Sequence, residues 1–157
     1  MGMIYIKQAQ QEHTSTSQLP LIAGNNSYLG DLLNSDAPPD KQLSAGFFRQ
    51  LKGEPLKYKY DYDEMKICVE GGMRVSDGTQ TVDAKPGDIF YFHDGDEITF
   101  DTDDYALNFF VGLRPKGQVY LQFSNLNPSI ALFICIAFEN FSLWFFFVIG
   151  LVLRPLW

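Results

Sequence analysis

The chain has 157 residues, of which 46% are hydrophobic and 20% charged, and its formal net charge is −7. This length suits one domain with a modest core, and the composition is that of a globular chain and not of a disordered one. The acidic balance and the absence of any long basic cluster argue against a nucleic-acid partner.

Residues 1–45 are polar and rich in turn-forming residues, as in QAQQEHTSTSQ, AGNNS and SDAPPDK. The segment MIYIK suits a short strand and YLGDLL one turn of helix. The Asn, Pro, Asp and Gly residues between them favour irregular backbone. We therefore predict an N-terminal arm that covers the surface of the body or reaches a partner subunit.

Residues 46–114 contain a series of short apolar segments separated by turn sequences such as KGEP, SDG, KPGD and HDGD. Such short runs, with turns at regular intervals, are typical of an all-β barrel or sandwich. No alternation of strands with helices is visible, which disfavours an α/β architecture. We predict one all-β antiparallel barrel over residues 46–117.

The stretch KYKYDYDE, residues 57–64, alternates between two kinds of side chain. Neighbouring side chains of a strand point to opposite faces, so Tyr58 and Tyr60 share one face while Lys57 and Lys59 share the other. We expect the phenols, with Glu64 at the end of their row, to point into the barrel and the lysines to point outward.

Residues 118–157 form an apolar tail, and its segment 130–153 is almost free of charged residues. That segment is long enough to cross a bilayer as a helix, although Glu139 near its middle costs about 2.5–3.5 kcal/mol on insertion scales. Two accounts stay open: a C-terminal membrane anchor, or an artefact of gene modelling in which an intron has been translated. On either account we expect the tail to add nothing to the barrel.

The N-terminal residues MGMIYIKQAQQEH lack the apolar core of a secretory signal. The two cysteines, Cys68 and Cys135, are too few for a disulfide framework, and Cys68 lies in an apolar strand pattern that predicts a buried thiol. We therefore expect a reducing, cytoplasmic location, with membrane attachment only if residues 130–153 are a genuine span.

Two segments, YKYDYDEMKICVEGGMRVSDG and AKPGDIFYFHDGDEITF, resemble the two conserved motifs of the cupin superfamily. The first motif of a metal-binding cupin has two histidines, a glutamate and a glycine, and the matching residues here are Tyr58, Tyr60, Glu64 and Gly71. The second motif has two turns and a third histidine, and the matching residues are Pro86, Gly87, Asp88, His93, Gly95 and Ile98. The resemblance implies an antiparallel jelly-roll barrel.

The chain is more closely similar to small cupins of the ethanolamine-utilisation EutQ type and to their fungal relatives. The similarity runs over residues 46–114, through GFFRQLKGEPL, DGTQTV and FFVGLR. Fungal relatives described as oxidoreductases of polyketide pathways imply an auxiliary enzyme of secondary metabolism. The ethanolamine-utilisation relatives imply instead an accessory role in two-carbon metabolism. One fold hosts many activities, so the resemblance favours the fold more strongly than either function.

A catalytic metal in this fold usually takes three imidazole ligands and one carboxylate. The chain contains two histidines, His13 and His93, so a single chain cannot supply three. A phenol gives up its proton reluctantly, which makes Tyr58 and Tyr60 poor ligands. We therefore expect no tightly bound metal and no cofactor, and only weak metal binding stays open.

The row of tyrosines has two interpretations. As structural residues, they fill the barrel interior. As functional residues, Tyr58 and Tyr60 orient a substrate carbonyl or hydroxyl group, and Glu64 acts as a general acid or base. The second interpretation makes these three residues the candidate catalytic set.

Four further residues are candidates for substrate binding. Arg49, on an early strand, can pair with Glu64 or with an anionic substrate. Tyr91 alternates with two phenylalanines and can also line the cavity. The other two candidates are His93, in a turn, and Ile98, at the place of the third cupin histidine.

Two classes of function stay open for the barrel. The residues favour proton transfer, as in an isomerase, dehydratase or cyclase, whereas the fungal relatives imply an oxidoreductase. The alternative is a non-catalytic cupin that holds a small ligand or acts as an accessory protein. In both cases the expected partner is a small organic molecule, and we expect a homodimer formed through the barrel.

Overall fold

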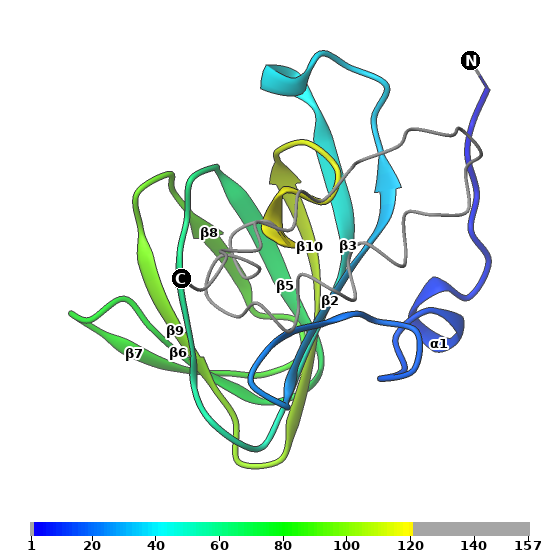
Figure 1. Ribbon diagram of the computed structural model, residues 1–157. Coiled ribbons are helices and arrows are strands. Elements are labelled where there is room, and N and C mark those ends of the chain that lie inside the picture. Colours follow the sequence, from blue (N-terminus) through cyan, green and yellow to red (C-terminus); the bar gives the residue numbers. More distant parts are fainter. Residues whose placement is uncertain (1, 121–157) are drawn as a thin grey trace, which may run out of the picture.

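The computed structural model describes residues 2–120, which form two antiparallel β-sheets that face each other (Figure 1). Its helical elements are short: α1 (Ala9–Glu12) and the 3-10 helix η1 (Pro39–Lys41). The strands are β1 (Leu21–Ala23), β2 (Ser27–Asn34), β3 (Leu43–Leu51), β4 (Leu56–Lys59), β5 (Glu64–Gly71), β6 (Met73–Ser76), β7 (Thr81–Ala84), β8 (Ile89–Phe92), β9 (Glu97–Asp101) and β10 (Tyr105–Leu113).

The large sheet has the strand order β1-β2-β3-β10-β5-β8, and the small sheet has the order β4-β9-β6-β7. Each of these pairings is antiparallel. Strands that are far apart in the sequence lie side by side, as when β10 pairs with both β3 and β5. This confirms the predicted all-β antiparallel roll.

Alternation along the strands decides which side chains lie between the sheets. On β4, Tyr58 is buried and stands opposite Ile98 of β9, whereas Lys57 and Lys59 are exposed. This is the pattern that the alternation predicts, because an extended backbone turns successive side chains to opposite faces. Most of the space between the sheets is filled by aromatic and aliphatic side chains.

The stretch assigned to an N-terminal arm contributes two strands to the large sheet. The prediction of a helical turn at YLGDLL is wrong, because these residues lie within β2, which pairs with β3 from Ser27 to Asn34. The predicted strand at MIYIK is absent from the structure. The helix α1 lies against the outer face of the large sheet, where Ala9 packs on a small apolar cluster that includes Phe47 (Figure 1).

The start of the predicted tail belongs to the packed body. Val119 is 2% exposed and lies in the main core, and the Tyr120 hydroxyl donates a 3.0 Å hydrogen bond to the Leu29 carbonyl oxygen. The expectation that the tail contributes nothing is therefore wrong for these first residues. No helix within residues 2–120 is long and apolar enough to cross a membrane, and the predicted span 130–153 lies outside the described residues.

Candidate functional site

Five polar side chains meet inside the barrel, and we call them the interior cluster: Tyr58, Tyr60, Tyr62, Glu64 and Lys66. All of them are buried, and Glu64 and Lys66 are only 1% and 3% exposed. Two elements position them. On β4 and in the segment that follows it, every second residue is a tyrosine that points inward. Glu64 and Lys66, the first and third residues of β5, continue this alternation and also point inward.

The Glu64 carboxylate is the centre of the interior cluster. The Tyr60 hydroxyl donates a 2.8 Å hydrogen bond to Glu64 Oε1, and Lys66 Nζ lies 2.9 Å from the same oxygen. The Tyr62 hydroxyl lies 3.4 Å from Glu64 Oε2 and 3.4 Å from the Tyr58 hydroxyl. The three phenols and one ammonium group therefore form a connected network around one carboxylate.

Burial changes the acidity of the groups around Glu64. Desolvation raises the pKa of the Tyr60 and Tyr62 phenols, and the nearby Glu64 charge raises both further. Desolvation lowers the pKa of Lys66, an effect that the Glu64 carboxylate opposes. The phenols are thus held in the neutral form, which donates hydrogen bonds, and the Lys66 amine loses its proton more readily than an exposed lysine.

Aromatic rings surround the end of the Lys66 side chain. Its Nζ atom lies 4.8 Å from the centre of the Phe48 ring, 5.2 Å from that of Phe110 and 5.6 Å from that of Phe100. Rings at these distances stabilise an ammonium group through their negative faces. They also exclude water, so the amine is surrounded by Glu64 and the rings, with the Arg114 charge nearby as a further influence that lowers its pKa.

A small cavity of about 20 Å³ lies among the interior cluster, Val119 and several apolar side chains. Such a volume is enough for about one water molecule. Val119, from the segment that follows β10, is one of the residues that line the cavity. A ligand larger than water therefore needs the lining side chains to move.

A second buried ion pair lies next to the interior cluster. The Arg114 guanidinium binds both carboxylate oxygens of Asp31, at 2.6 Å and 3.0 Å, and its centre lies 5.4 Å from the Tyr62 ring centre. Tyr62 also packs against Gly112, where an added Cβ would meet the ring at 3.0 Å. The Tyr62 ring is thus packed against both the Arg114 guanidinium and the backbone of Gly112.

The structure brings together part of the predicted site. Tyr58, Tyr60 and Glu64 lie in the interior cluster, and Ile98 is buried directly opposite Tyr58. Arg49 does not meet them. It lies on the outer face of β3, where its Nε donates a 2.7 Å hydrogen bond to the Thr14 carbonyl oxygen. Because Phe48 points inward, its neighbour Arg49 must point outward, and Lys66 takes the place beside Glu64 that was expected for Arg49.

Tyr91 and His93 also lie away from the interior. Tyr91 is 48% exposed and borders a separate surface hollow of about 150 Å³, because Phe90 and Phe92 take the inward positions of β8. His93 is exposed in the following turn, and its backbone N–H donates to Asp96 Oδ2. Its ring packs at 4.2 Å on that of Tyr91. The prediction that Tyr91 lines the interior cavity is therefore wrong.

Sequence reasoning missed Lys66 and Arg114. The signal for Lys66 was present, because a residue two positions after an inward Glu64 on one strand must also point inward. Arg114 had no local signal, since its partner Asp31 lies 83 residues away and is brought near by the pairing of β2, β3 and β10.

The cupin fold implies a metal centre, and the residues at that place do not fit one. Neutral phenols at Tyr58 and Tyr60 and the hydrocarbon of Ile98 offer no good metal ligand, and Lys66 binds the Glu64 oxygen that a metal would need. Within residues 2–120, no three His, Cys, Asp or Glu side chains lie close enough together to hold a metal ion.

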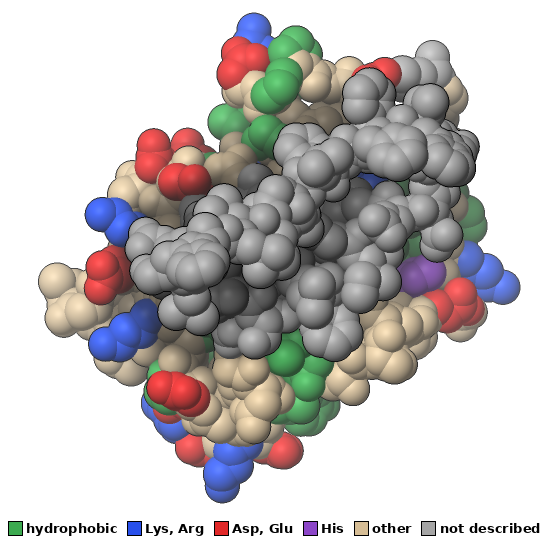
Figure 2. Space-filling model, in the orientation of Figure 1, with side chains coloured by type: hydrophobic (Ala, Val, Ile, Leu, Met, Phe, Trp, Pro, Cys, Tyr) green, Lys and Arg blue, Asp and Glu red, His purple; other side chains and the backbone are tan. Residues whose placement is uncertain are grey.

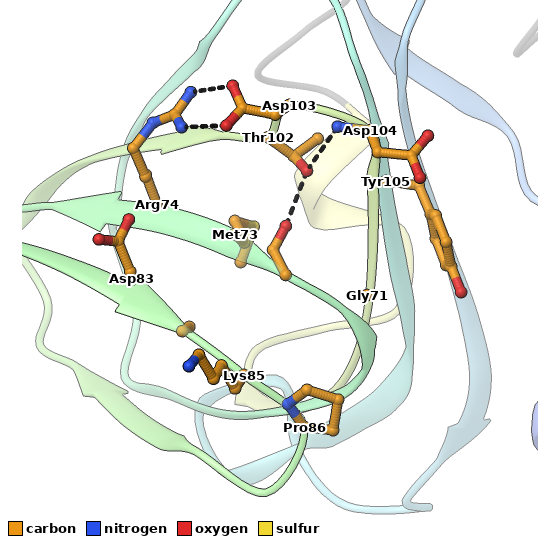
Figure 3. Close-up of a pocket in the computed structure, with 12 residues that line it drawn as sticks. Gly71, Met73, Arg74, Asp83, Lys85, Pro86, Thr102, Asp103, Asp104 and Tyr105 are labelled. Carbon is orange, nitrogen blue, oxygen red and sulfur yellow. Dashed lines mark hydrogen bonds and ion pairs between the residues drawn. The ribbon is translucent and has the colours of Figure 1, made fainter.

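A wider surface pocket of about 570 Å³ lies between β6, β7 and the loop before β10. Figure 3 shows Arg74 and Asp103 facing each other at its rim. Arg74 Nη1 donates a 2.8 Å hydrogen bond to Asp103 Oδ2. The Thr102 hydroxyl donates to the Gly72 carbonyl oxygen and accepts from the Asp104 backbone N–H. Arg74 also binds Asp101, so its charge is already neutralised. On the face in Figure 2, Lys and Arg side chains likewise alternate with Asp and Glu along the visible border. The interior cluster therefore remains the better site.

Comparisons with known proteins agree with this fold. The family model described as "Ethanolamine utilisation protein EutQ" matches residues 2–116. The structure of the EutQ protein of Clostridium difficile is similar with a TM-score of 0.51 and 21% identity, over 66% of this chain and 80% of that one. No curated protein sequence matches the chain.

Two further solved structures share the fold. Ectoine synthase from P. lautus has a TM-score of 0.56 and 16% identity, over 71% of this chain and 79% of that one. A cupin superfamily protein from Desulfitobacterium hafniense has a TM-score of 0.50 and 16% identity, over 71% and 100%. At these identities the likeness shows the fold alone. The kinship with polyketide-pathway oxidoreductases stays a prediction.

Proposed function

Because the chain belongs to the EutQ family of ethanolamine utilisation proteins, we propose that it is an accessory cupin that holds a small polar organic molecule inside its barrel. The names of its relatives support an association with the two-carbon amino alcohol ethanolamine or its products. The interior cluster is the proposed binding site.

One observation carries this proposal: a carboxylate and an ammonium group are buried together where apolar side chains would fill the barrel. Removing two such charges from water costs several kcal/mol per ion, and well-packed hydrophobic residues often stabilise a protein as well or better. Glu64 and Lys66 are only 1% and 3% exposed and 2.9 Å apart. A binding role explains this cost better than a structural role.

The interior cluster suits a ligand with few carbon atoms and one or two polar groups. Lys66 and the phenols can donate hydrogen bonds to a carbonyl or hydroxyl oxygen, and Glu64 can accept one from a hydroxyl or amine. The aromatic walls exclude large polar ligands, because each buried polar atom of the ligand needs a partner. Ethanolamine, acetaldehyde and acetate all satisfy these demands.

The test is calorimetric titration of the full-length chain with each of these three molecules. We expect saturable binding of at least one of them, which Glu64→Gln weakens by about tenfold through loss of a charged hydrogen-bond partner. Glu97→Gln is the matched control, since Glu97 is exposed on β9. Absence of saturable binding for all three, or equal affinity in the Glu64→Gln variant, would contradict the proposal.

Proton transfer on a bound carbonyl compound is a second candidate function. Its support is the pair of hydrogen-bond donors, Tyr60 and Lys66, that share one oxygen of Glu64 at 2.8 Å and 2.9 Å. A carboxylate held in this way can remove a proton next to a carbonyl while a phenol stabilises the enolate. Exchange of these protons for deuterium, followed by NMR, should require Glu64. Exchange that is equally fast in the Glu64→Gln variant would exclude this role.

A further inference from the structure

Lys66 is a nucleophilic group that binding alone does not explain. Binding a ligand does not require an amine whose pKa is lowered by desolvation. Nor does it require a base beside that amine, such as Glu64, that can take its proton. We propose that Lys66 Nζ forms a covalent imine with the carbonyl carbon of a small aldehyde or ketone held in the interior cluster. This inference rests on the proposed binding of a small molecule in the barrel, and it goes further by naming the chemical class and the bond.

The geometry places the three groups needed for imine formation side by side. Lys66 lies on β5, which pairs with β8 and β10, and it lines the cavity together with Tyr60 and Tyr62. Glu64 Oε1 contacts both the amine, at 2.9 Å, and the Tyr60 hydroxyl, at 2.8 Å. A nucleophile, a general base and a hydrogen-bond donor for the carbonyl oxygen thus lie within one hydrogen-bonded network.

The surroundings favour the reactive form of the amine. A lysine amine attacks a carbonyl only when it is unprotonated, and desolvation in an apolar pocket is one established way to make that form available. Burial among Phe48, Phe100 and Phe110 has this effect on Lys66. The Glu64 carboxylate opposes this effect by stabilising the ammonium form, but at 2.9 Å it is also the nearest base to which the amine can pass its proton.

The reaction balances without any further reagent. Glu64 first accepts a proton from the ammonium group. The Lys66 nitrogen then forms a bond to the carbonyl carbon, and the C–O bond of the resulting carbinolamine breaks. Overall, the two remaining amine hydrogens leave with the carbonyl oxygen as one water molecule, and no electrons are gained or lost. Glu64 and Tyr60 relay the protons, and the water leaves to solvent by the opening that admitted the carbonyl compound.

The small volume of the cavity limits the size of the carbonyl compound. Val119 is 2% exposed and lines the cavity, so its side chain is one of those whose movement enlarges the space for a ligand. Compounds of about two or three carbons demand the smallest displacement from a packed interior. Removal of two methyl groups by Val119→Ala should therefore speed adduct formation.

The test traps the imine in the full-length chain. Acetaldehyde and cyanoborohydride are added at neutral pH, and tryptic peptides are analysed by mass spectrometry for alkylated lysines. We expect Lys66 to be alkylated faster than exposed Lys57, by about tenfold for each unit by which its pKa is lower. Glu64→Gln should slow the Lys66 reaction by about a hundredfold through loss of its general base, and Val119→Ala should speed it.

The outcomes separate this inference from the proposed binding role. Alkylation of Lys57 and other exposed lysines with no preference for Lys66 would overturn the imine. If acetaldehyde still binds saturably in the calorimeter, the binding role stands without the covalent step. If it neither binds nor alkylates Lys66, both proposals fail for aldehydes. A Lys66→Met variant that gives the same pattern of reduced adducts as the native chain would also overturn the imine.

Discussion

Lys66 Nζ lies 2.9 Å from Glu64 Oε1 in the interior of the barrel, two residues away on the same face of one strand. The pair is flanked by three aromatic rings and by the Tyr60 hydroxyl. Each charge is compensated mainly by the other, because water has almost no access to either. Removing one member therefore has a different consequence from removing both.

The first prediction concerns the stability of single and double variants. Lys66→Met leaves the Glu64 carboxylate buried without its cation, and we expect a loss of about 3–5 kcal/mol in the free energy of unfolding. The double variant Glu64→Gln with Lys66→Met removes both charges and should recover most of that loss. Urea unfolding of the full-length chain measures both values. A double variant less stable than Lys66→Met alone would contradict this account.

The second prediction concerns alkaline pH. The phenols of Tyr58, Tyr60 and Tyr62 have pKa values raised above 10.0, chiefly by burial. Above that pH the unfolded chain loses these protons while the folded chain keeps them. The folded state then binds more protons, so stability falls as pH rises. Below about pH 10 both states keep the protons and these groups add no pH dependence.

The slope of this alkaline loss can be assigned to single residues. Each raised phenol steepens the fall by up to about 1.4 kcal/mol per pH unit. Tyr60→Phe should remove one such contribution, whereas Tyr5→Phe should change nothing because Tyr5 is exposed. Urea unfolding at a series of alkaline pH values measures the slope. Equal slopes for the native chain and Tyr60→Phe would contradict the prediction.

The fold could be predicted from the sequence because its signals are local. Strand alternation at 57–63 and the turn sequences between the apolar runs each act over a few residues. The same local rule placed Tyr58 and Tyr60 inside. The predictions for Arg49 and Tyr91 were wrong because the alternation was not applied to them. Each is next to an inward-facing phenylalanine, so each must point outward.

The remaining features of the site depend on long-range pairing. The Asp31–Arg114 ion pair exists because β2 and β10 both pair with β3, and no local pattern indicates which strands become neighbours. The strands assigned to an arm were missed for a similar reason. β2 carries a glycine, a charged residue and half-buried side chains, so its strand character comes from its position beside β3.

The third prediction concerns metals. We expect the native chain to hold less than one equivalent of zinc, nickel, iron or manganese, measured by plasma mass spectrometry. Histidine at Tyr58, Tyr60 and Ile98 would supply the imidazoles of a cupin centre, with Glu64 as the fourth ligand. Metal binding should need Lys66→Met as well, because the Lys66 ammonium otherwise occupies the carboxylate. One tightly held metal in the native chain, lost on Glu64→Ala, would contradict this prediction.

The fourth prediction is a homodimer through the outer face of the large sheet. Met65 and Tyr91 stand opposite each other on β5 and β8 and are 59% and 48% exposed, and nearby Ile89 is 72% exposed. A second copy can cover such adjoining apolar side chains on an edge of the sheet. Light scattering should show a dimer at micromolar concentration and a monomer for Ile89→Lys. Lys85→Glu is the charge control, and a native monomer would contradict the prediction.

The last prediction concerns the residues that follow the barrel. Val119 is buried in the main core, and the Tyr120 hydroxyl donates a 3.0 Å hydrogen bond to the Leu29 carbonyl oxygen. A chain that ends after Gly117 loses both contacts, whereas a chain that ends after Tyr120 keeps them. Burial of a valine side chain contributes about 1.5–3 kcal/mol and one hydrogen bond about 0.5–1.5 kcal/mol. The shorter chain should therefore be less stable by about 2–4 kcal/mol.

Point variants of the full-length chain keep this comparison independent of truncation. Val119→Asp places a charge in the core and should lower the urea midpoint strongly, because a buried, unpaired carboxylate is costly. Gln118→Asp is the neighbouring control, since the Gln118 side chain makes only an exposed hydrogen bond to Asp61. Equal midpoints for both variants, together with equal stability of the two truncated chains, would show that Val119 adds no stability to the core. In that case Val119→Ala should not change the rate at which Lys66 is alkylated either.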